Sequence, residues 1–234
     1  MVWTDSQDYG ADEISGMEDK SVSNRQAHYS MIGSSLCIIL LLAVFFLYLN
    51  TYRRKLLDKL RHIFFFTILM AIIIAVAAFT LRYAPTGFIY IVPFTWCPII
   101  ARVFYDSRTA IFVHLITIFI VSLAVPAPYL FILIQFVVGV IAVISLRDMT
   151  QRAQLAQTAA FILLTYSILY TAATFLMAGN ISDIDYRYYI YFAINAVLVI
   201  CSYGLIFLFE RCFGLISNIT LVELTNVNSN LMLA

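Results

Sequence analysis

Seven apolar runs separated by short polar connections occupy most of the chain between Met31 and Phe209. An α-helix needs about 20 apolar residues to cross a bilayer, with a usable range of about 17–25. Five runs fit that range comfortably, and the third and fourth are short. The runs are Met31–Leu49, Ile63–Leu81, Phe88–Val103, Ala110–Val125, Tyr129–Leu146, Ala159–Ala178 and Tyr188–Phe209. The pattern predicts an all-α membrane protein with a seven-transmembrane helix bundle over residues 31–211.

The composition argues against a soluble protein with the same helices. The chain is 63% hydrophobic and 12% charged, whereas globular domains are roughly a quarter charged. Too little polar sequence remains to cover so large an apolar core. The short connections also leave no room for a soluble catalytic domain within the chain.

Basic residues near the span ends predict the orientation of the bundle, because Lys and Arg resist translocation across the membrane. If the N-terminus is outside, ten of the 14 Lys and Arg residues fall in cytoplasmic segments. The strongest single signal is residues 51–61, TYRRKLLDKLR, which belongs beside anionic lipid. We therefore expect an N-terminus outside and a C-terminus in the cytoplasm.

The two ends of the chain differ in character. Residues 1–30 are rich in Ser and Asp without a clear period, which predicts a disordered extracellular tail or the remnant of an extracellular domain. Residues 212–234 carry apolar side chains at roughly helical spacing, including Leu215 and Ile219. We expect a cytoplasmic amphipathic linker helix there, leading to an output domain beyond Ala234.

Polar side chains within apolar spans are expensive, so each is a candidate for function. His114 lies in the fourth run, Gln135 in the fifth and Asn195 in the seventh. Together with Trp96 of the third run, they are candidates for lining a ligand cavity. The alternative for each polar residue is an interhelical hydrogen bond that holds the bundle together.

The third run carries Pro93 and Pro98 around Trp96. Each proline lacks a backbone N–H and clashes with a preceding carbonyl, so this helix should be bent or broken. Broken helices are tolerated in membranes where protein covers them or where they line a cavity. Simple kinking for packing and a binding cavity both remain open.

Two predicted cytoplasmic turns combine basic and acidic residues. Arg102, Asp106 and Arg108 lie between the third and fourth runs, and we expect Asp106 to pair with one of these arginines. Arg147 and Arg152 flank a similar turn after the fifth run. An exposed ion pair contributes little stability, but one partly out of water can define a geometry.

Several chemistries find no support in the sequence. The three histidines are scattered over different segments, and no helix has metal-ligand spacing. There is no nucleophile elbow, phosphate-binding glycine loop or zinc-protease motif. The seventh run has no lysine for a retinal Schiff base. We therefore expect no catalytic residue, metal or cofactor in this chain, and no nucleic-acid partner.

Three stretches together resemble a known family. Residues 92–124, VPFTWCPIIARVFYDSRTAIFVHLITIFIVSLA, resemble spans three and four of bacterial seven-transmembrane receptors with an intracellular HD hydrolase domain. Asp106 and Arg108 match the short turn of that family. Residues 145–159, SLRDMTQRAQLAQTA, resemble its link between spans five and six. Residues 221–232, LVELTNVNSNLM, resemble the segment before the HD domain, with Glu223 and Leu224 matching its Glu-Leu pair.

The resemblance implies the membrane part of a PgpH-type cyclic di-AMP phosphodiesterase in a bacterial cytoplasmic (inner) membrane. Its partners would be the lipid bilayer, an unknown ligand, the HD domain of the same polypeptide and, in a homodimer, a second copy. The HD domain would hold a pair of divalent metal ions. The expected role is a sensor module that controls the hydrolase. A passive anchor and dimerisation module is the first alternative, and a small-solute transporter or substrate-binding subunit is the second.

Overall fold

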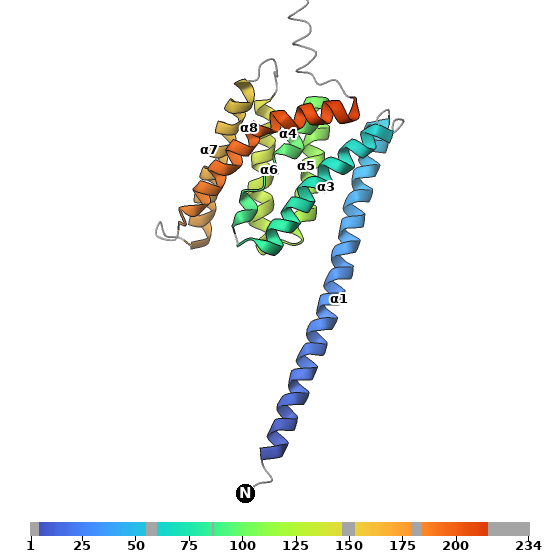
Figure 1. The fold of residues 1–234 in the computed structure, drawn as a ribbon, viewed down its shortest axis with the longest axis vertical. Helices are drawn as coiled ribbons and strands as arrows, with labels where there is room; N and C mark the ends of the chain where they lie inside the picture. Colours follow the sequence, from blue (N-terminus) through green and yellow to red (C-terminus); the bar gives the residue numbers. More distant parts are fainter. Residues whose placement is uncertain (1–4, 55–59, 86, 147–152, 179–183, 215–234) are drawn as a thin grey trace, which may run out of the picture. The chain divides into compact units, whose positions relative to one another are not determined.

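The computed structural model describes residues 5–54, 60–85, 87–146, 153–178 and 184–214 of the chain. Two compact parts make up the chain, Met1–Ala43 and Val44–Ala234. The described residues of the first lie within helix α1 (Asp5–Tyr52), and the second contains the end of α1 and all later helices (Figure 1). We call the described part of the second unit, residues 44–214, the bundle.

Helix α1 differs from the prediction at its start. It begins at Asp5 and therefore includes most of the residues that are predicted to be a polar extracellular tail or the remnant of an extracellular domain. Helix growth is cooperative, because each residue added to an existing turn gains one backbone hydrogen bond. No proline interrupts residues 1–50, so nothing in that stretch stops the helix. The extracellular location of these residues stays a prediction.

The other helices follow the apolar runs, with one exception. They are α3 (Leu60–Tyr83), the 3₁₀ turn η1 (Phe88–Tyr90), α4 (Trp96–Phe104), α5 (Ser107–Ser122), α6 (Pro128–Ser145), α7 (Ala153–Ala178) and α8 (Arg187–Phe213). The third run, Phe88–Val103, is predicted as one span but is divided between η1 and α4. The proline-based prediction of a break in this segment is confirmed.

An all-α membrane bundle is confirmed for the part of the chain that the structure describes, which contains helices and no strand. Within those described residues, five helices are long and apolar enough to cross a membrane, and α5 is a shorter apolar helix. The five segments are His28–Tyr52, Leu60–Tyr83, Pro128–Ser145, Gln154–Met177 and Arg187–Phe213.

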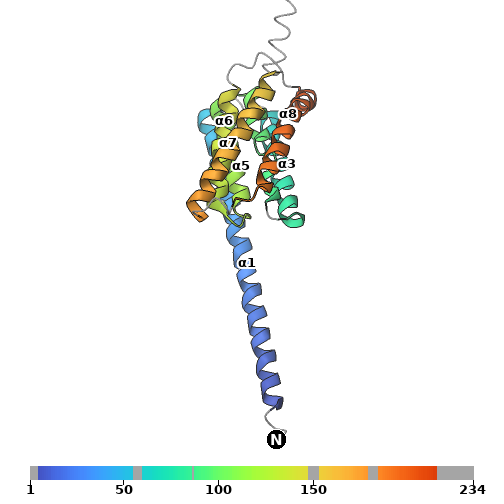
Figure 2. The same ribbon diagram turned by 90° about the vertical axis from the view of Figure 1, so that its left-hand side faces the viewer.

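Consecutive helices of the bundle pack against one another from α4 through α8. Figure 2 shows α5, α6 and α7 side by side, with α3 and α8 on the other side of the bundle. In Figure 1, α8 crosses the bundle obliquely, and it contacts η1 and α4 as well as α7. The last helix therefore touches both halves of the divided third segment.

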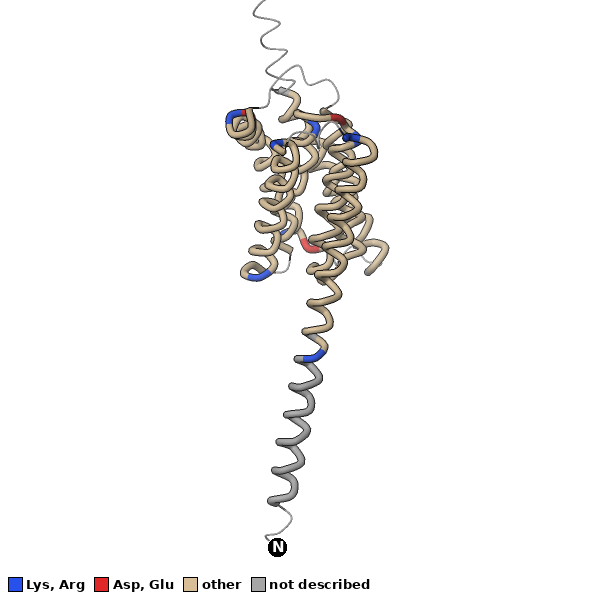
Figure 3. Tube along the Cα trace, turned by 90° about the vertical axis from the view of Figure 1, so that its right-hand side faces the viewer, with Lys and Arg blue, Asp and Glu red and all other residues tan. Residues whose placement is uncertain are grey.

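Large apolar side chains fill the interior of the bundle. The fully buried ones include Phe65, Phe66, Phe94, Phe131, Tyr166 and Phe192. Apolar side chains also cover the outside, for example Phe64, Ile72, Leu164 and Phe207. Charged residues of the bundle gather at its two ends (Figure 3). An apolar belt between two charged ends is the surface that a bilayer requires.

Candidate functional site

The most unusual part of the bundle is the irregular stretch Gly87–Thr95, which we call the break. It begins at Gly87, whose φ of 104° lies in the left-handed region open to glycine. A Cβ at this position would also lie 3.2 Å from the Tyr188 ring. Pro93 cannot donate a backbone hydrogen bond, and α4 starts three residues later, at Trp96.

Pro98 does not contribute to the break, contrary to the expectation that both prolines disturb the helix. It is the third residue of α4. The first four N–H groups of an α-helix have no partner within the helix, so a proline there removes no hydrogen bond. Only Pro93 falls where a continuous helix would need a donor.

Asn195 of α8 binds the exposed backbone of the break. Its Nδ2 donates to the carbonyl oxygens of Tyr90 and Val92, each at 3.0 Å, and lies 3.4 Å from that of Ile91. Carbonyls outside a regular helix need such partners, because the bilayer core supplies no water. Asn195 is fully buried. One amide group of α8 therefore compensates for the missing helical hydrogen bonds of the third segment.

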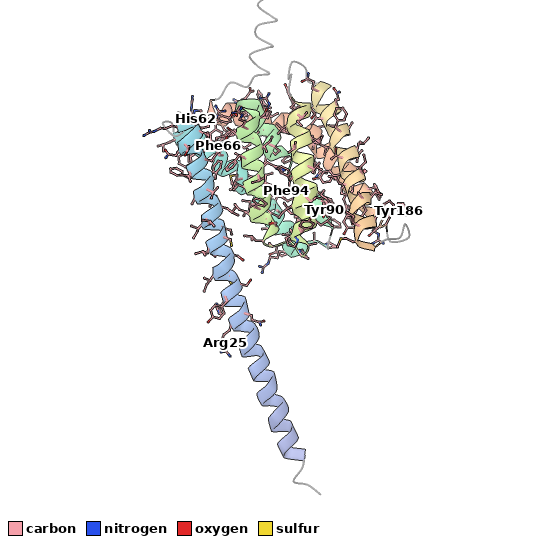
Figure 4. All side chains as sticks on the ribbon, turned by 180° about the vertical axis from the view of Figure 1, so that it is seen from behind. Arg25, His62, Phe66, Tyr90, Phe94 and Tyr186 are labelled. Carbon is pink, nitrogen blue, oxygen red and sulfur yellow. The ribbon has the colours of Figure 1, made fainter. Side chains whose placement is uncertain are left out.

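Trp96 makes a second connection between the third segment and α8. Its indole Nε1 donates to the backbone carbonyl of Leu198 at 2.8 Å. Leu198 lies about one turn beyond Asn195, so the middle of the break and the start of α4 are both bonded to a short stretch of α8. Figure 4 shows Phe94 between the two ends of the bundle, with His62 near one end and Tyr186 near the other.

His114 and Gln135 form a second set of bonds, among α5, α6 and α7. The Nε2 atom of His114 lies 2.9 Å from the Gln135 carbonyl oxygen. The Tyr166 hydroxyl donates to Gln135 Oε1 at 2.7 Å. All three side chains are buried. The close approach of His114 to α6 depends on Gly139, where a Cβ would lie 2.1 Å from His114 Nε2.

The four candidate ligand residues thus fall into two pairs. Trp96 and Asn195 connect the third segment to α8, while His114 and Gln135 connect α5 to α6. Each of the four residues takes part in an interhelical hydrogen bond, which is the alternative to a ligand-binding role. Pockets of about 370, 500 and 520 Å³ are lined by other residues. A ligand-binding role for these four stays a prediction.

Asp106 forms an ion pair with a different arginine from the predicted ones. Its carboxylate Oδ2 lies 2.5 Å from Arg53 Nη2, just after the end of α1. Arg102 instead donates to the Tyr105 carbonyl at 3.4 Å. The predicted pairing with Arg102 or Arg108 is therefore wrong, because folding brings the end of α1 to the start of α5. Arg147 and Arg152 lie outside the described residues.

Asp106 is the residue just before α5, where a negative charge is favourable. Its Oδ1 accepts a hydrogen bond from the Thr109 hydroxyl at 2.7 Å. Partial burial raises the pKa of this carboxyl, but the bond from Thr109 and the charge of Arg53 outweigh that effect. The net result is a pKa below the ordinary value, so Asp106 is ionised at neutral pH.

Aromatic rings join the end of α8 to α3 and α4. Phe65 of α3 contacts Phe209 and Phe213 of α8, with ring centroids 5.3 and 5.5 Å apart. It also contacts Phe104 of α4 at 5.3 Å. Helix α8 ends at Phe213, and Gly214 follows in a left-handed conformation that stops an α-helix. The predicted linker, with Leu215, Ile219, Glu223 and Leu224, lies outside the described residues.

Sequence reasoning missed three residues of this arrangement, namely Arg53, Gly139 and Tyr166. A glycine within an otherwise apolar helix is a weak signal of close approach, and it was available for Gly139. The other two have no distinguishing local pattern. Among the described residues, no group of three or more His, Cys, Asp or Glu could hold a metal ion.

The fold and the bonded break define a polytopic α-helical membrane protein whose third segment is discontinuous. The chain matches the model of the family described as 7TM receptor with intracellular HD hydrolase, over residues 28–217. The chain belongs to this family of seven-transmembrane receptors, and the match covers their transmembrane region. Searches of curated proteins and of solved structures gave no match.

Proposed function

We propose that this bundle is the membrane input module of a cytoplasmic HD-domain phosphodiesterase that acts on cyclic di-AMP. In this proposal the N-terminus is outside, the C-terminus is cytoplasmic, and the membrane is the bacterial inner membrane. The family match supports a linked hydrolase. The basic residues at the proposed cytoplasmic end, among them Arg53, Arg61 and Arg102, support the orientation.

The attachment of the break to α8 is the observation that carries the proposal. Asn195 and Trp96 bond the third segment to the last helix of the bundle. That helix leads toward the end of the chain at which the HD domain is expected. Its final turns are packed on Phe65 through Phe209 and Phe213. A rearrangement of the break would therefore change the bonds that position α8.

A signal can act here only through a ligand or membrane state that distinguishes two arrangements of the bundle. Interhelical hydrogen bonds in membrane proteins contribute about 0.6 kcal/mol each on average. A tenfold preference of a ligand for one state corresponds to about 1.4 kcal/mol. The free energy of a tenfold preference is therefore enough to offset the loss of one or two of the hydrogen bonds at the break.

Catalysis would belong to the HD domain, with its His and Asp ligands and its pair of divalent metal ions. The nucleotide sequence that follows the codon for Ala234 provides a direct check. A downstream HD motif in the same reading frame would support the proposal. A stop codon or an unrelated domain there would refute the proposed coupling.

The functional experiment uses the polypeptide with its HD domain, reconstituted in lipid nanodiscs. We expect Asn195→Leu to change cyclic di-AMP hydrolysis by about fivefold or more, the lower end of usual allosteric coupling. Val197→Leu is the matched control on α8, because Val197 is 60% exposed. Unchanged hydrolysis and unchanged regulation in Asn195→Leu would instead indicate a passive anchor. Full regulation after the bundle is replaced by an unrelated seven-span anchor would indicate the same.

The broken third segment also favours a second function, since transporters often bind solutes at discontinuous helices. No Asp, Glu, Lys or Arg occurs in residues 64–81, 109–146 or 188–209, which leaves little charge to couple an ion gradient. Solute uptake by this chain alone in proteoliposomes would support transport over signalling.

A further inference from the structure

A pocket of about 500 Å³ lies at the end of the bundle where α1 stops and α5 starts. Its lining comes from both helices. Tyr48, Tyr52 and Arg53 line it from α1 and the residue that follows, and Arg108 and Phe112 line it from the first two turns of α5. We call it the tyrosine–arginine pocket. None of its residues takes part in the bonds of the break.

One wall of the pocket is aromatic. The rings of Tyr48 and Phe112 are stacked, with centroids 4.1 Å apart and planes 17° from parallel. Tyr52 lies next to Tyr48, with ring centroids 5.5 Å apart. Both stacked side chains are half-buried, so part of their apolar surface faces the pocket. Tyrosines at helix ends are typical of the membrane–water interface.

The remainder of the lining is cationic. Arg53 is oriented by its ion pair with Asp106, which is itself bonded to Thr109. A guanidinium carries five N–H donors, so donors other than those that face Asp106 can serve a second anion. Arg108 is exposed, and it lies in the first turn of α5, where the helix dipole adds partial positive charge. With Asp106 included, the net charge around the pocket is positive.

We propose that the tyrosine–arginine pocket binds an anionic phospholipid. The phosphate would lie between Arg53 and Arg108, and the glycerol and first acyl carbons would lie against the stacked rings of Tyr48 and Phe112. A soluble phosphate would use the guanidinium groups and leave the aromatic wall in contact with water. A ligand that is anionic at one end and apolar at the other uses the whole lining.

The position of the pocket supports the lipid as its occupant. Helices α1 and α3 are candidate membrane spans, and their basic connection begins at Arg53 and Arg54. Basic pockets at the membrane surface attract anionic lipid, worth about 1 kcal/mol for each Lys or Arg near it. The ion pair with Asp106 adds specificity, because it restricts Arg53 before the lipid arrives.

The test is native mass spectrometry of the purified chain with three probes: dioleoylphosphatidylglycerol, dioleoylphosphatidylcholine and sn-glycerol 3-phosphate. We expect phosphatidylglycerol to bind most tightly. Arg108→Gln should weaken it about tenfold, the factor for loss of one charge-assisted hydrogen bond. Arg54→Gln is the matched control, because it removes the same charge from an exposed position outside the pocket lining. It should weaken binding less than about twofold, and both variants should keep the thermal midpoint of the wild type.

Three outcomes would overturn the proposal. Equal losses in Arg108→Gln and Arg54→Gln would mean diffuse attraction of lipid to a basic surface. Equal affinity for glycerol 3-phosphate and phosphatidylglycerol would mean a soluble anion site. Unchanged lipid affinity in Arg108→Gln, with altered hydrolase activity in the polypeptide that carries the HD domain, would mean a protein-docking surface. The lipid measurement does not depend on the hydrolase, so its failure is distinguishable from failure of the proposed function.

Discussion

Gly139→Ala tests the close contact between α5 and α6. A Cβ at position 139 would lie 2.1 Å from His114 Nε2 and 2.2 Å from His114 Cδ2. Both distances are far inside van der Waals contact, so the imidazole must move. His114 is buried and bonded to the Gln135 carbonyl, one turn before Gly139 on the same helix. Movement of the ring away from α6 would break that bond.

Three effects set the size of the expected change. Overpacking of a core costs about 1–3 kcal/mol, and an interhelical hydrogen bond in a membrane contributes about 0.6, at most about 1.7 kcal/mol. Alanine is favoured over glycine within a helix by about 0.5–1 kcal/mol, which opposes the first two effects. The free energy of unfolding should therefore fall by about 1–4 kcal/mol.

The assay is equilibrium unfolding of the purified chain in mixed detergent micelles, monitored by far-ultraviolet circular dichroism. Gly204→Ala is the matched control, since nothing lies within 4 Å of a Cβ at that position of α8. It should be neutral or slightly stabilising. In a His114→Ala background the obstacle is gone, so Gly139→Ala should become neutral or stabilising there. If Gly139→Ala in the otherwise wild-type chain unfolds no more easily than Gly204→Ala, the close-contact explanation is wrong.

Two further predictions use the same unfolding assay. The lowered pKa of Asp106 means that its bonds with Arg53 and Thr109 stabilise the fold above the unfolded pKa and are lost as pH falls through the folded pKa. Asp106→Asn should remove that acid-side decline, at a cost of about 0.2–1 kcal/mol at neutral pH because the pair is partly exposed. An unchanged acid-side decline would contradict this role. Trp96→Phe should lower the free energy of unfolding by about 0.6–1.7 kcal/mol, because the bond to the Leu198 carbonyl is lost. A variant as stable as wild type would mean that the indole bond contributes little.

Hydropathy was sufficient to locate most of the helices. The run Ile63–Leu81 became α3 at Leu60–Tyr83, and Tyr129–Leu146 became α6 at Pro128–Ser145. Any span must satisfy its backbone hydrogen bonds internally, so a long apolar run implies a helix without further information. The ends shift by a few residues because polar residues at the interface still form helical turns.

The third run shows which local signal hydropathy misses. Its residues from Phe88 to Ala101 are apolar apart from Thr95, but the backbone is divided at Pro93. Proline geometry predicted this break from the sequence, whereas its boundaries depend on Gly87 and on bonds to α8. The partner of those carbonyls lies about 100 residues away in sequence, so no local pattern identifies it.

The prediction of the ion-pair partner of Asp106 was wrong for the same reason. Its sequence neighbours Arg102 and Arg108 are close along the chain, but Arg53 is brought to it by the packing of the end of α1 on α5. The partner of this carboxylate is the arginine that the tertiary structure places next to the start of α5. The contact of Gly139 with His114 is likewise invisible until two helices are placed together.

The connections of the break determine how a signal could pass through the bundle. The Asn195 Nδ2 group and the indole of Trp96 are both bonded to backbone carbonyls, and α8 takes part in each bond. A conformational change that separates the third segment from α8 removes the Asn195 donor from the Tyr90 carbonyl, and the bilayer core supplies no water to replace it. Two discrete arrangements are therefore favoured over a gradual movement. Such a two-state element is what a receptor needs if its input and its output are to be coupled.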